Sequence, residues 1–265
     1  MKLNKLMFSV VGLLALALPA LAGTAPAKNP KNPVAPAPEE ELLGITVGLN
    51  YDSRLIYHGI NFGEHYLSGD VNIDVPLNDV LRANVEASYG NVFDSAFDGG
   101  DYQRLVLGAG VSADLGAAEL GLGYRWIHHE DVPDLFADDG HEVGLTLATS
   151  AGPVNFGIGS YYDFGDEGWY FEAAVNTEIK VTDSISVVPG VAIGYGLDYA
   201  ANRTAFNEVL DDGFIAVTPS LAVPIKLTSN ATLTPYIAAR LPIDALDDTG
   251  SDDYLYGGVS INVKF

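Results

Sequence analysis

Twelve segments of the sequence alternate apolar and polar residues with a period of two, and this pattern limits the fold more than any other feature. The first segment contains Ile45, Val47, Leu49 and Tyr51, with polar residues and glycine between them. A period of two predicts β-strands, and these segments are longer than the five or six residues usual in soluble sheets. The predicted strands cover residues 44–58, 65–76, 81–92, 102–115, 118–128, 141–151, 154–164, 169–181, 185–197, 214–227, 231–241 and 254–265.

The gaps between the predicted strands alternate in length. Short gaps such as 116–117 and 152–153 follow the even-numbered strands, whereas most odd-numbered strands are followed by longer ones, such as 129–140. An even number of strands with short turns at one end and longer loops at the other is typical of outer-membrane barrels. The predicted fold class is therefore all-β, a transmembrane antiparallel up-and-down β-barrel of about twelve strands formed by residues 43–265.

The two faces of the predicted strands differ sharply in charge. When the apolar phase of each strand is assigned to one side, no Asp, Glu, Lys or Arg falls on that side. A charge facing lipid costs roughly 2–4 kcal/mol at the bilayer midplane, so this face is suited to hydrocarbon. Aromatic residues of the apolar phase gather at the loop ends of the strands and predict an interfacial girdle. They are Tyr57, Tyr89, Trp126, Tyr162, Phe164, Trp169, Phe171 and Tyr195.

Both ends of the chain indicate export. Residues 1–22 have a basic start, a short apolar run and Ala20-Leu21-Ala22, which predicts a cleaved secretory signal peptide. Residues 23–42 are rich in Pro and Ala and predict an extended periplasmic linker. The alternating end of the chain, up to Phe265, resembles the C-terminal signal strand of bacterial outer-membrane proteins. That resemblance implies recognition by the barrel-assembly machinery and a location in the outer membrane of a Gram-negative cell, among lipid and lipopolysaccharide.

The net charge of −22 restricts the partners of the chain. Such a charge disfavours nucleic acid and anionic membrane surfaces. The predicted loops are strongly acidic, with Arg203 their one basic residue, and should concentrate cations at the barrel mouth. Loose binding of divalent cations and a merely solvated acidic surface both remain open interpretations of these loops.

The predicted lumen carries charged residues at alternate positions. Asp52, Arg54 and His58 share one face of the first predicted strand, opposite Leu55 and Tyr57, and should point into the barrel. Twelve strands lie between the filled interior of eight and the open channel of sixteen. The lumen is therefore either a charged constriction that selects small polar solutes or a salt-bridge network that stiffens the barrel. The predicted pore-lining residues are Asp52, Arg54, His58, Glu86, Arg104, Arg125, Glu142, Glu172 and Arg240.

The stretch Ser53-Arg54-Leu55-Ile56-Tyr57-His58-Gly59 resembles the S-R-Y-x-F-R-G segment in the first strand of the TorF-type porin family, a conserved proteobacterial outer-membrane barrel family. Ser53, Arg54, Ile56 and Gly59 fit that pattern. Leu55, Tyr57 and His58 stand where the family has Tyr, Phe and Arg, so His58 removes a fixed positive charge. The resemblance implies a porin-like barrel.

No enzymatic site or cofactor site is predicted. None of the five His residues has a Ser two positions away on the same face, as a barrel hydrolase would favour. His128 and His129 are adjacent on a strand and should point to opposite faces, which is poor geometry for a metal. The predicted function is a porin-like channel for passive diffusion of small hydrophilic solutes or ions, favouring cations. The alternatives are a structural or adhesive outer-membrane barrel with a lumen closed by salt bridges, and a secreted soluble β protein.

Overall fold

The computed structural model describes residues 44–265 except 97–99, 131–138, 166, 200–210 and 249–250. The predicted signal peptide and linker, residues 1–22 and 23–42, lie outside the described residues. None of the described residues forms a helix with the length and apolarity required to span a membrane. The elements are β1 (Ile45–Tyr57), β2 (Ile60–Pro76), β3 (Leu81–Ser95), β4 (Tyr102–Asp114), β5 (Ala118–Glu130), β6 (Asp139–Ala151), β7 (Val154–Asp163), β8 (Gly168–Thr177), β9 (Ile179–Lys180), β10 (Ser186–Leu197), β11 (Gly213–Ala222), β12 (Ile225–Lys226), β13 (Ala231–Pro242) and β14 (Tyr254–Lys264).

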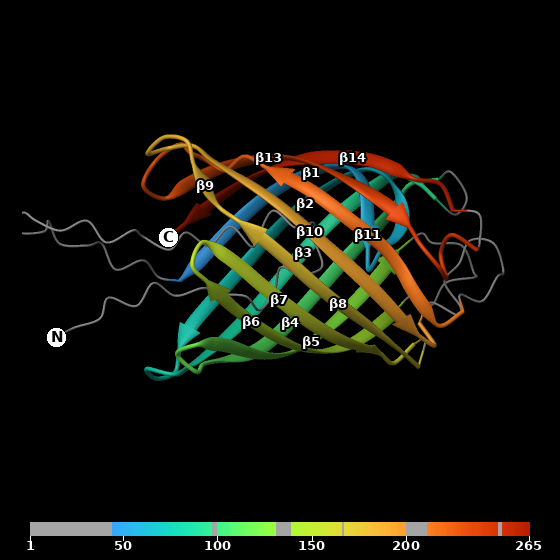
Figure 1. Ribbon diagram of the computed structural model, residues 1–265, viewed down its shortest axis with the longest axis horizontal. Helices are drawn as coiled ribbons and strands as arrows, with labels where there is room; N and C mark the ends of the chain where they lie inside the picture. Colours follow the sequence, from blue (N-terminus) through green and yellow to red (C-terminus); the bar gives the residue numbers. More distant parts are fainter. Residues whose placement is uncertain (1–43, 97–99, 131–138, 166, 200–210, 249–250) are drawn as a thin grey trace, which may run out of the picture.

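The described elements form one closed antiparallel barrel of twelve continuous strands (Figure 1). β9 continues β8 beyond Glu178, and β12 continues β11 beyond Val223 and Pro224, so these short elements add no separate strand. Each strand pairs with its neighbours in sequence, β1 pairs with β14, and the pairing of β11 with β13 completes the ring. The predicted fold class and strand number are confirmed.

The short turns at one end of the barrel share a construction that the sequence explains. Leu77, Leu115 and Leu227 each donate a backbone hydrogen bond to the first residue or so of the following strand, at 2.9 Å. A polar side chain closes several of these turns from within. Thr182 Oγ1, for example, accepts from the backbone N–H groups of Ser184 and Ile185. Short polar side chains favour such turns because they replace ladder bonds locally.

The exterior of the barrel is apolar along its height. Leu122, Leu145 and Ile158 are 50 %, 50 % and 56 % exposed, each in the middle of its strand. Their neighbours along the chain, which face inward as the period of two requires, are Gly or Thr. The ladders of the barrel pair backbone groups between neighbouring strands, and an apolar exterior of this kind is suited to contact with lipid.

A row of aromatic rings crosses the loop end of the exterior. Tyr162 contacts both Phe164 and Trp169, with ring centroids 5.1 and 5.0 Å apart. The row continues from Trp169 to Phe171 and Tyr195 and ends at Phe214 on β11. It follows the predicted girdle over β7 to β11, with one correction. Tyr57, predicted to belong to the girdle, is 2 % exposed and lies inside the barrel.

Candidate functional site inside the barrel

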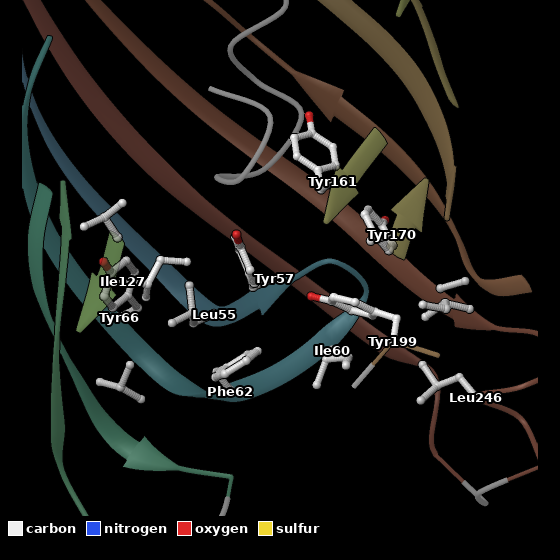
Figure 2. Packing of buried hydrophobic residues seen from close by; sticks show 14 of the residues in the cluster. Leu55, Tyr57, Ile60, Phe62, Tyr66, Ile127, Tyr161, Tyr170, Tyr199 and Leu246 are labelled. Atoms are coloured by element: carbon white, nitrogen blue, oxygen red, sulfur yellow. The ribbon is translucent and has the colours of Figure 1, made fainter. Parts of the chain in front are cut away.

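The connection between β1 and β2 bends away from the wall into the barrel. The ladder between β1 and β14 ends at the pair Asp52 and Gly258, and the ladder between β2 and β3 ends at Gly63 and Ser95. Residues 53–62, called here the inward hairpin, continue beyond both ladders. Ile56 and Tyr57 pair with Asn61 and Ile60, after a register shift between Leu55 and Ile56. Figure 2 shows this hairpin projecting among side chains of the surrounding wall.

The tip of the inward hairpin is a two-residue turn. His58 and Gly59 both have positive φ, 50° and 79°, as the type I′ turn favoured in tight hairpins requires. A Cβ atom at Gly59 would lie 2.7 Å from Cγ2 of Ile215, so glycine also allows close contact with β11. β2 therefore starts at Ile60 rather than at the predicted residue 65, because this turn is shorter than the loop predicted there.

Apolar side chains of the inward hairpin fill the loop half of the lumen (Figure 2). Leu55, Tyr57, Ile60 and Phe62 are all buried, although the alternation of β1 predicted that Leu55 and Tyr57 face lipid. That prediction is wrong because the bend carries both side chains inward. They join a buried cluster that includes Tyr66, Val92, Tyr102, Val106, Ile127, Tyr161, Tyr170, Tyr199, Ile215, Ala216 and Leu246.

Glu142 and Arg104 anchor Tyr57 to the opposite part of the wall. The Tyr57 hydroxyl donates a hydrogen bond of 2.8 Å to Oε2 of Glu142 on β6. The guanidinium carbon of Arg104, on β4, lies 4.8 Å from the centroid of the Tyr57 ring. A cation over an aromatic face is attracted by the ring quadrupole, most strongly where both groups are shielded from water. Tyr57 is thus fixed at its hydroxyl and across its face.

Tyrosines of the lumen hold His58. The imidazole stacks between the rings of Tyr57 and Tyr170, with centroid distances of 4.1 Å to each. Its Nδ1 atom forms a hydrogen bond of 2.8 Å with the Tyr199 hydroxyl and lies 3.6 Å from Oε2 of Glu142. His58, predicted as a pore-lining residue, therefore lies inside the barrel within a packed aromatic layer.

Arg240 anchors the backbone of the turn. Its Nη1 donates to the carbonyl oxygen of Gly59 at 3.0 Å, and its Nη2 donates to Ser251 and to the carbonyl of Asp252. The side chain is almost fully buried and lies 4.3 Å from the centroid of the Tyr254 ring. Burying a guanidinium is costly unless its donors find acceptors, and two carbonyl oxygens and the Ser251 hydroxyl accept from Nη1 and Nη2, whereas Nε has no hydrogen-bond partner among the described residues.

Arg125 is the centre of a charged cluster that also contains Glu86 and Glu142. Its Nε donates to Glu86 at 2.8 Å, and its Nη1 lies 3.4 Å from Oε1 of Glu142. Glu142 therefore accepts a hydrogen bond from Tyr57 on Oε2 and one from Arg125 on Oε1. The cluster connects β3, β5 and β6 to the inward hairpin through the hydrogen bonds of one carboxylate.

The remaining predicted lumen residues lie apart from this cluster. Glu172 accepts a hydrogen bond from the hydroxyl of Tyr170 at 3.2 Å, and Asp52 accepts one from Tyr236 at 2.5 Å. Arg54 forms an ion pair of 2.6 Å with Glu64 and lies over the Tyr254 ring. The structure thus brings together His58, Glu86, Arg104, Arg125 and Glu142. Asp52 lies instead beside Tyr236, and Arg54 and Arg240 both contact the ring of Tyr254.

Inward tyrosines are the functional residues that the sequence reasoning missed. Tyr161 and Tyr170 are buried inside, next to the outward residues Tyr162 and Trp169. Both faces of β7 and β8 carry aromatic residues there, so hydrophobicity alone does not separate inward tyrosines from outward aromatic residues. The alternation along β8 could have identified Tyr170 as inward, because it lies two residues from the inward Glu172.

The two halves of the lumen differ in access to water. In the loop half, buried side chains contributed by β1, β4, β6, β7, β8, β11 and β13 meet inside the wall. In the turn half, inward residues such as Asn50, Asp70 and Asp74 are partly exposed, and Asn50 donates to Asp70 at 2.6 Å. The turn half of the lumen is therefore more accessible to water than the loop half, where the inward hairpin lies. Among the described residues, no group of three or more His, Asp or Glu side chains is arranged to hold a metal ion.

Comparison with known proteins supports the fold. No family model and no curated protein matches the sequence. Among solved structures, the barrel is similar to the KdgM porin, with a TM-score of 0.52 and 8 % identity over 83 % of this chain and 99 % of that one. It is also similar to the COG4313 outer membrane channel from Pseudomonas putida F1, with a TM-score of 0.56 and 13 % identity over 86 % of this chain and 99 % of that one.

These likenesses and the apolar exterior place the chain in the outer-membrane β-barrel fold, and with it in the outer membrane. The predicted location is confirmed.

Proposed function

We propose that this protein is a porin-like outer-membrane channel for passive diffusion of small hydrophilic solutes or ions. The observation that carries the proposal is the pairing of an apolar exterior with an interior of charged and hydrogen-bonding groups, centred on Arg125, Glu86 and Glu142. Such groups are costly within a membrane unless they serve a polar pathway or pair with each other. The similarity in fold to a porin and to an outer membrane channel supports a role of these groups in a polar pathway. We assign it no catalytic step and no cofactor.

The channel should favour cations. Asp70 and Asp74 face inward in the turn half of the lumen and are partly exposed, and the described loop residues include Asp211, Asp212 and Asp248. Acidic groups at the mouth and along the lumen raise the local concentration of cations. The predicted charged constriction fits a cation preference. Arg125 is neutralised by the carboxylates of Glu86 and Glu142, so it does not form a separate anion site.

We further propose the partners that the sequence implies. The terminal Phe265 would direct the chain to the barrel-assembly machinery, and lipid and lipopolysaccharide would surround the exterior. Membership of the TorF-type porin family remains a proposal that rests on residues 53–59.

A second candidate function is a structural or adhesive barrel with a closed lumen. The buried inward hairpin favours it, because Tyr57, Glu142 and Arg240 are nearly inaccessible to water in this structure. On that account the charged residues stiffen the barrel, and function lies in the loops.

Single-channel recording of the refolded protein in a planar bilayer tests the proposal. A channel gives discrete current steps, and a salt gradient gives a reversal potential of the sign expected for cation preference. The double variant Asp70→Asn/Asp74→Asn should reduce that preference without abolishing the steps. Absence of steps from protein shown to be folded and inserted, under all voltages applied, would favour the closed barrel instead.

A further inference from the structure

An open strand edge lies beside the inward hairpin. β14 runs Tyr254–Lys264, yet its ladder with β1 covers only the part from Gly258 onward. Residues 254–257 therefore border the place in the wall that the hairpin has left. Near this point Gly257 N donates to Ser53 Oγ at 3.0 Å, a side-chain bond where a backbone ladder would otherwise continue. A strand edge of this kind readily accepts another strand.

The register of β1 with β14 indicates how the hairpin would fill this edge. Continuing the pairing beyond Asp52 and Gly258 brings Leu55 opposite Leu255. Leu255 is 71 % exposed on the lipid face. In the wall position Leu55 would share that face with Leu49 and Tyr51, as the period of two predicts. The apolar alternation of β1 therefore suits a wall position, whereas the structure shows an inward one.

The contacts that hold the inward position are separable from the barrel wall. They include the hydrogen bonds of Tyr57 to Glu142, of His58 to Tyr199 and of the Gly59 carbonyl to Arg240, the packing of Arg104 on Tyr57, and apolar contacts. None of them belongs to the ladders of the twelve strands. His65, almost opposite the bend, has a φ of 56°, a left-handed conformation that is strained for a residue with a side chain.

We propose that the inward hairpin is a gate with two positions, closing the lumen when it lies inside and opening it when it pairs with residues 254–257 of β14. This inference rests on the proposed channel function. Movement to the wall would carry Leu55 and Tyr57 from the loop half of the lumen to the lipid face and leave the Arg125 cluster lining a passage. His58 and Phe62 would leave the packed aromatic layer, although their phase keeps them on the inward face of the wall.

Two engineered disulfides trap the two positions, and the chain contains no native Cys to interfere. The inward trap is Gly59→Cys with Ile215→Cys, because a Cβ at Gly59 would lie 3.7 Å from the Cβ of Ile215, within the range of a disulfide. The wall trap is Leu55→Cys with Leu255→Cys. In the structure Leu55 is buried inside and Leu255 faces outward, so this disulfide requires the hairpin to move. The four single-Cys variants are the controls.

Cross-linking of the full-length protein in bilayers is measured first, by mass spectrometry after oxidation, and current is then recorded before and after reduction. We expect both disulfides to form. The oxidised inward trap should carry a current roughly tenfold or more below its reduced form, and the oxidised wall trap should show a comparable rise in open probability. The positive φ of Gly59 strains a Cys there, and the wall trap tests the gate independently if the inward trap does not fold.

The gate is overturned if the wall trap never cross-links in folded barrels, or if the oxidised inward trap conducts as well as its reduced form. The second result would leave the channel function intact. A wall trap that cross-links fully and carries no current would instead overturn the channel function, and the gate with it, although the movement itself would be established. The cross-link thus reports the movement, and the current reports the channel.

Discussion

The hydroxyl of Tyr57 on β1 donates a 2.8 Å hydrogen bond to Glu142 on β6, although these strands are not neighbours in the barrel. The bond therefore crosses the interior rather than following the wall. The same carboxylate faces Arg125 through its other oxygen. One side chain thus connects the inward hairpin to the charged cluster, and changes at Glu142 should affect both.

Neutralising Glu142 should destabilise the barrel. Glu142→Gln keeps an oxygen for Tyr57 but removes the charge that faces Arg125, which retains Glu86. We expect a loss of about 1–3 kcal/mol in the free energy of unfolding, the range for a hydrogen bond to a charged group. Urea unfolding of the refolded protein measures it. Glu130→Gln, at the exposed end of β5, is the matched control and should change stability by less than about 0.5 kcal/mol. Equal effects of the two variants would show that the cluster adds nothing to stability.

The pair of Tyr236 and Asp52 gives a separate test in another part of the lumen. The Tyr236 hydroxyl donates to Asp52 at 2.5 Å, and Asp52 is buried. Tyr236→Phe leaves this carboxylate without that donor, and we expect a loss of about 1–3 kcal/mol in unfolding free energy. Tyr89→Phe removes a phenol that bonds Gln103 on the exposed exterior and serves as the control. A loss in the control as large as that in Tyr236→Phe would count against a special role for the buried bond.

The assignment of residues to the lipid face or the lumen face predicts different effects of an arginine substitution on β5 and on β6. Leu122 on β5 is half exposed on the exterior, whereas Thr146 on β6 faces inward. Leu122→Arg should cost roughly 2–4 kcal/mol if it lies near the bilayer midplane, and should lower the yield of refolded barrel in vesicles. Thr146→Arg should refold nearly as well as the wild type. The heat-dependent shift in gel mobility measures the folded fraction, and similar yields for both variants would contradict the assignment.

Most of the fold could be predicted because each strand carries its own period-two signal. Leu145 and Leu147 on β6 face out while Glu142 faces in, and nothing in their surroundings changes that alternation. Most strand boundaries followed within a few residues for the same reason, whereas β2 starts at Ile60, five residues before its predicted start. Closure into a ring then followed from the principle that a membrane-spanning sheet pairs its first strand with its last.

The inward hairpin could not be predicted, because alternation specifies which residues share a face but not which way a strand bends. Leu55 and Tyr57 keep the phase of Leu49 and Tyr51, yet the bend of the hairpin away from the wall places both in the lumen. The contacts that stabilise this position come from Glu142, Tyr199 and Arg240, far away in sequence. Only the packed structure brings them to the hairpin.

The terminal residue gives a prediction about assembly rather than stability. The Phe265 side chain is about half exposed, and its backbone N–H donates to the carbonyl of Ile45 at 2.9 Å. Phe265→Ala keeps that backbone bond, so refolding in detergent should be nearly unchanged. In cells we expect a clear fall in the amount of folded barrel in the outer membrane, because the proposed signal for the assembly machinery is lost. Equal membrane levels of variant and wild type would overturn the proposed partner.

Tyr57→Phe tests the central claim most directly, when single-channel currents of the variant and the wild type are recorded side by side. The variant keeps the ring that packs beneath Arg104 and loses the hydroxyl that bonds Glu142. If a closing hairpin governs a channel, the size of each current step should stay the same while the open probability rises roughly tenfold, the factor for a bond of this class. An open probability equal to that of the wild type, or silence from both folded proteins, would contradict the account.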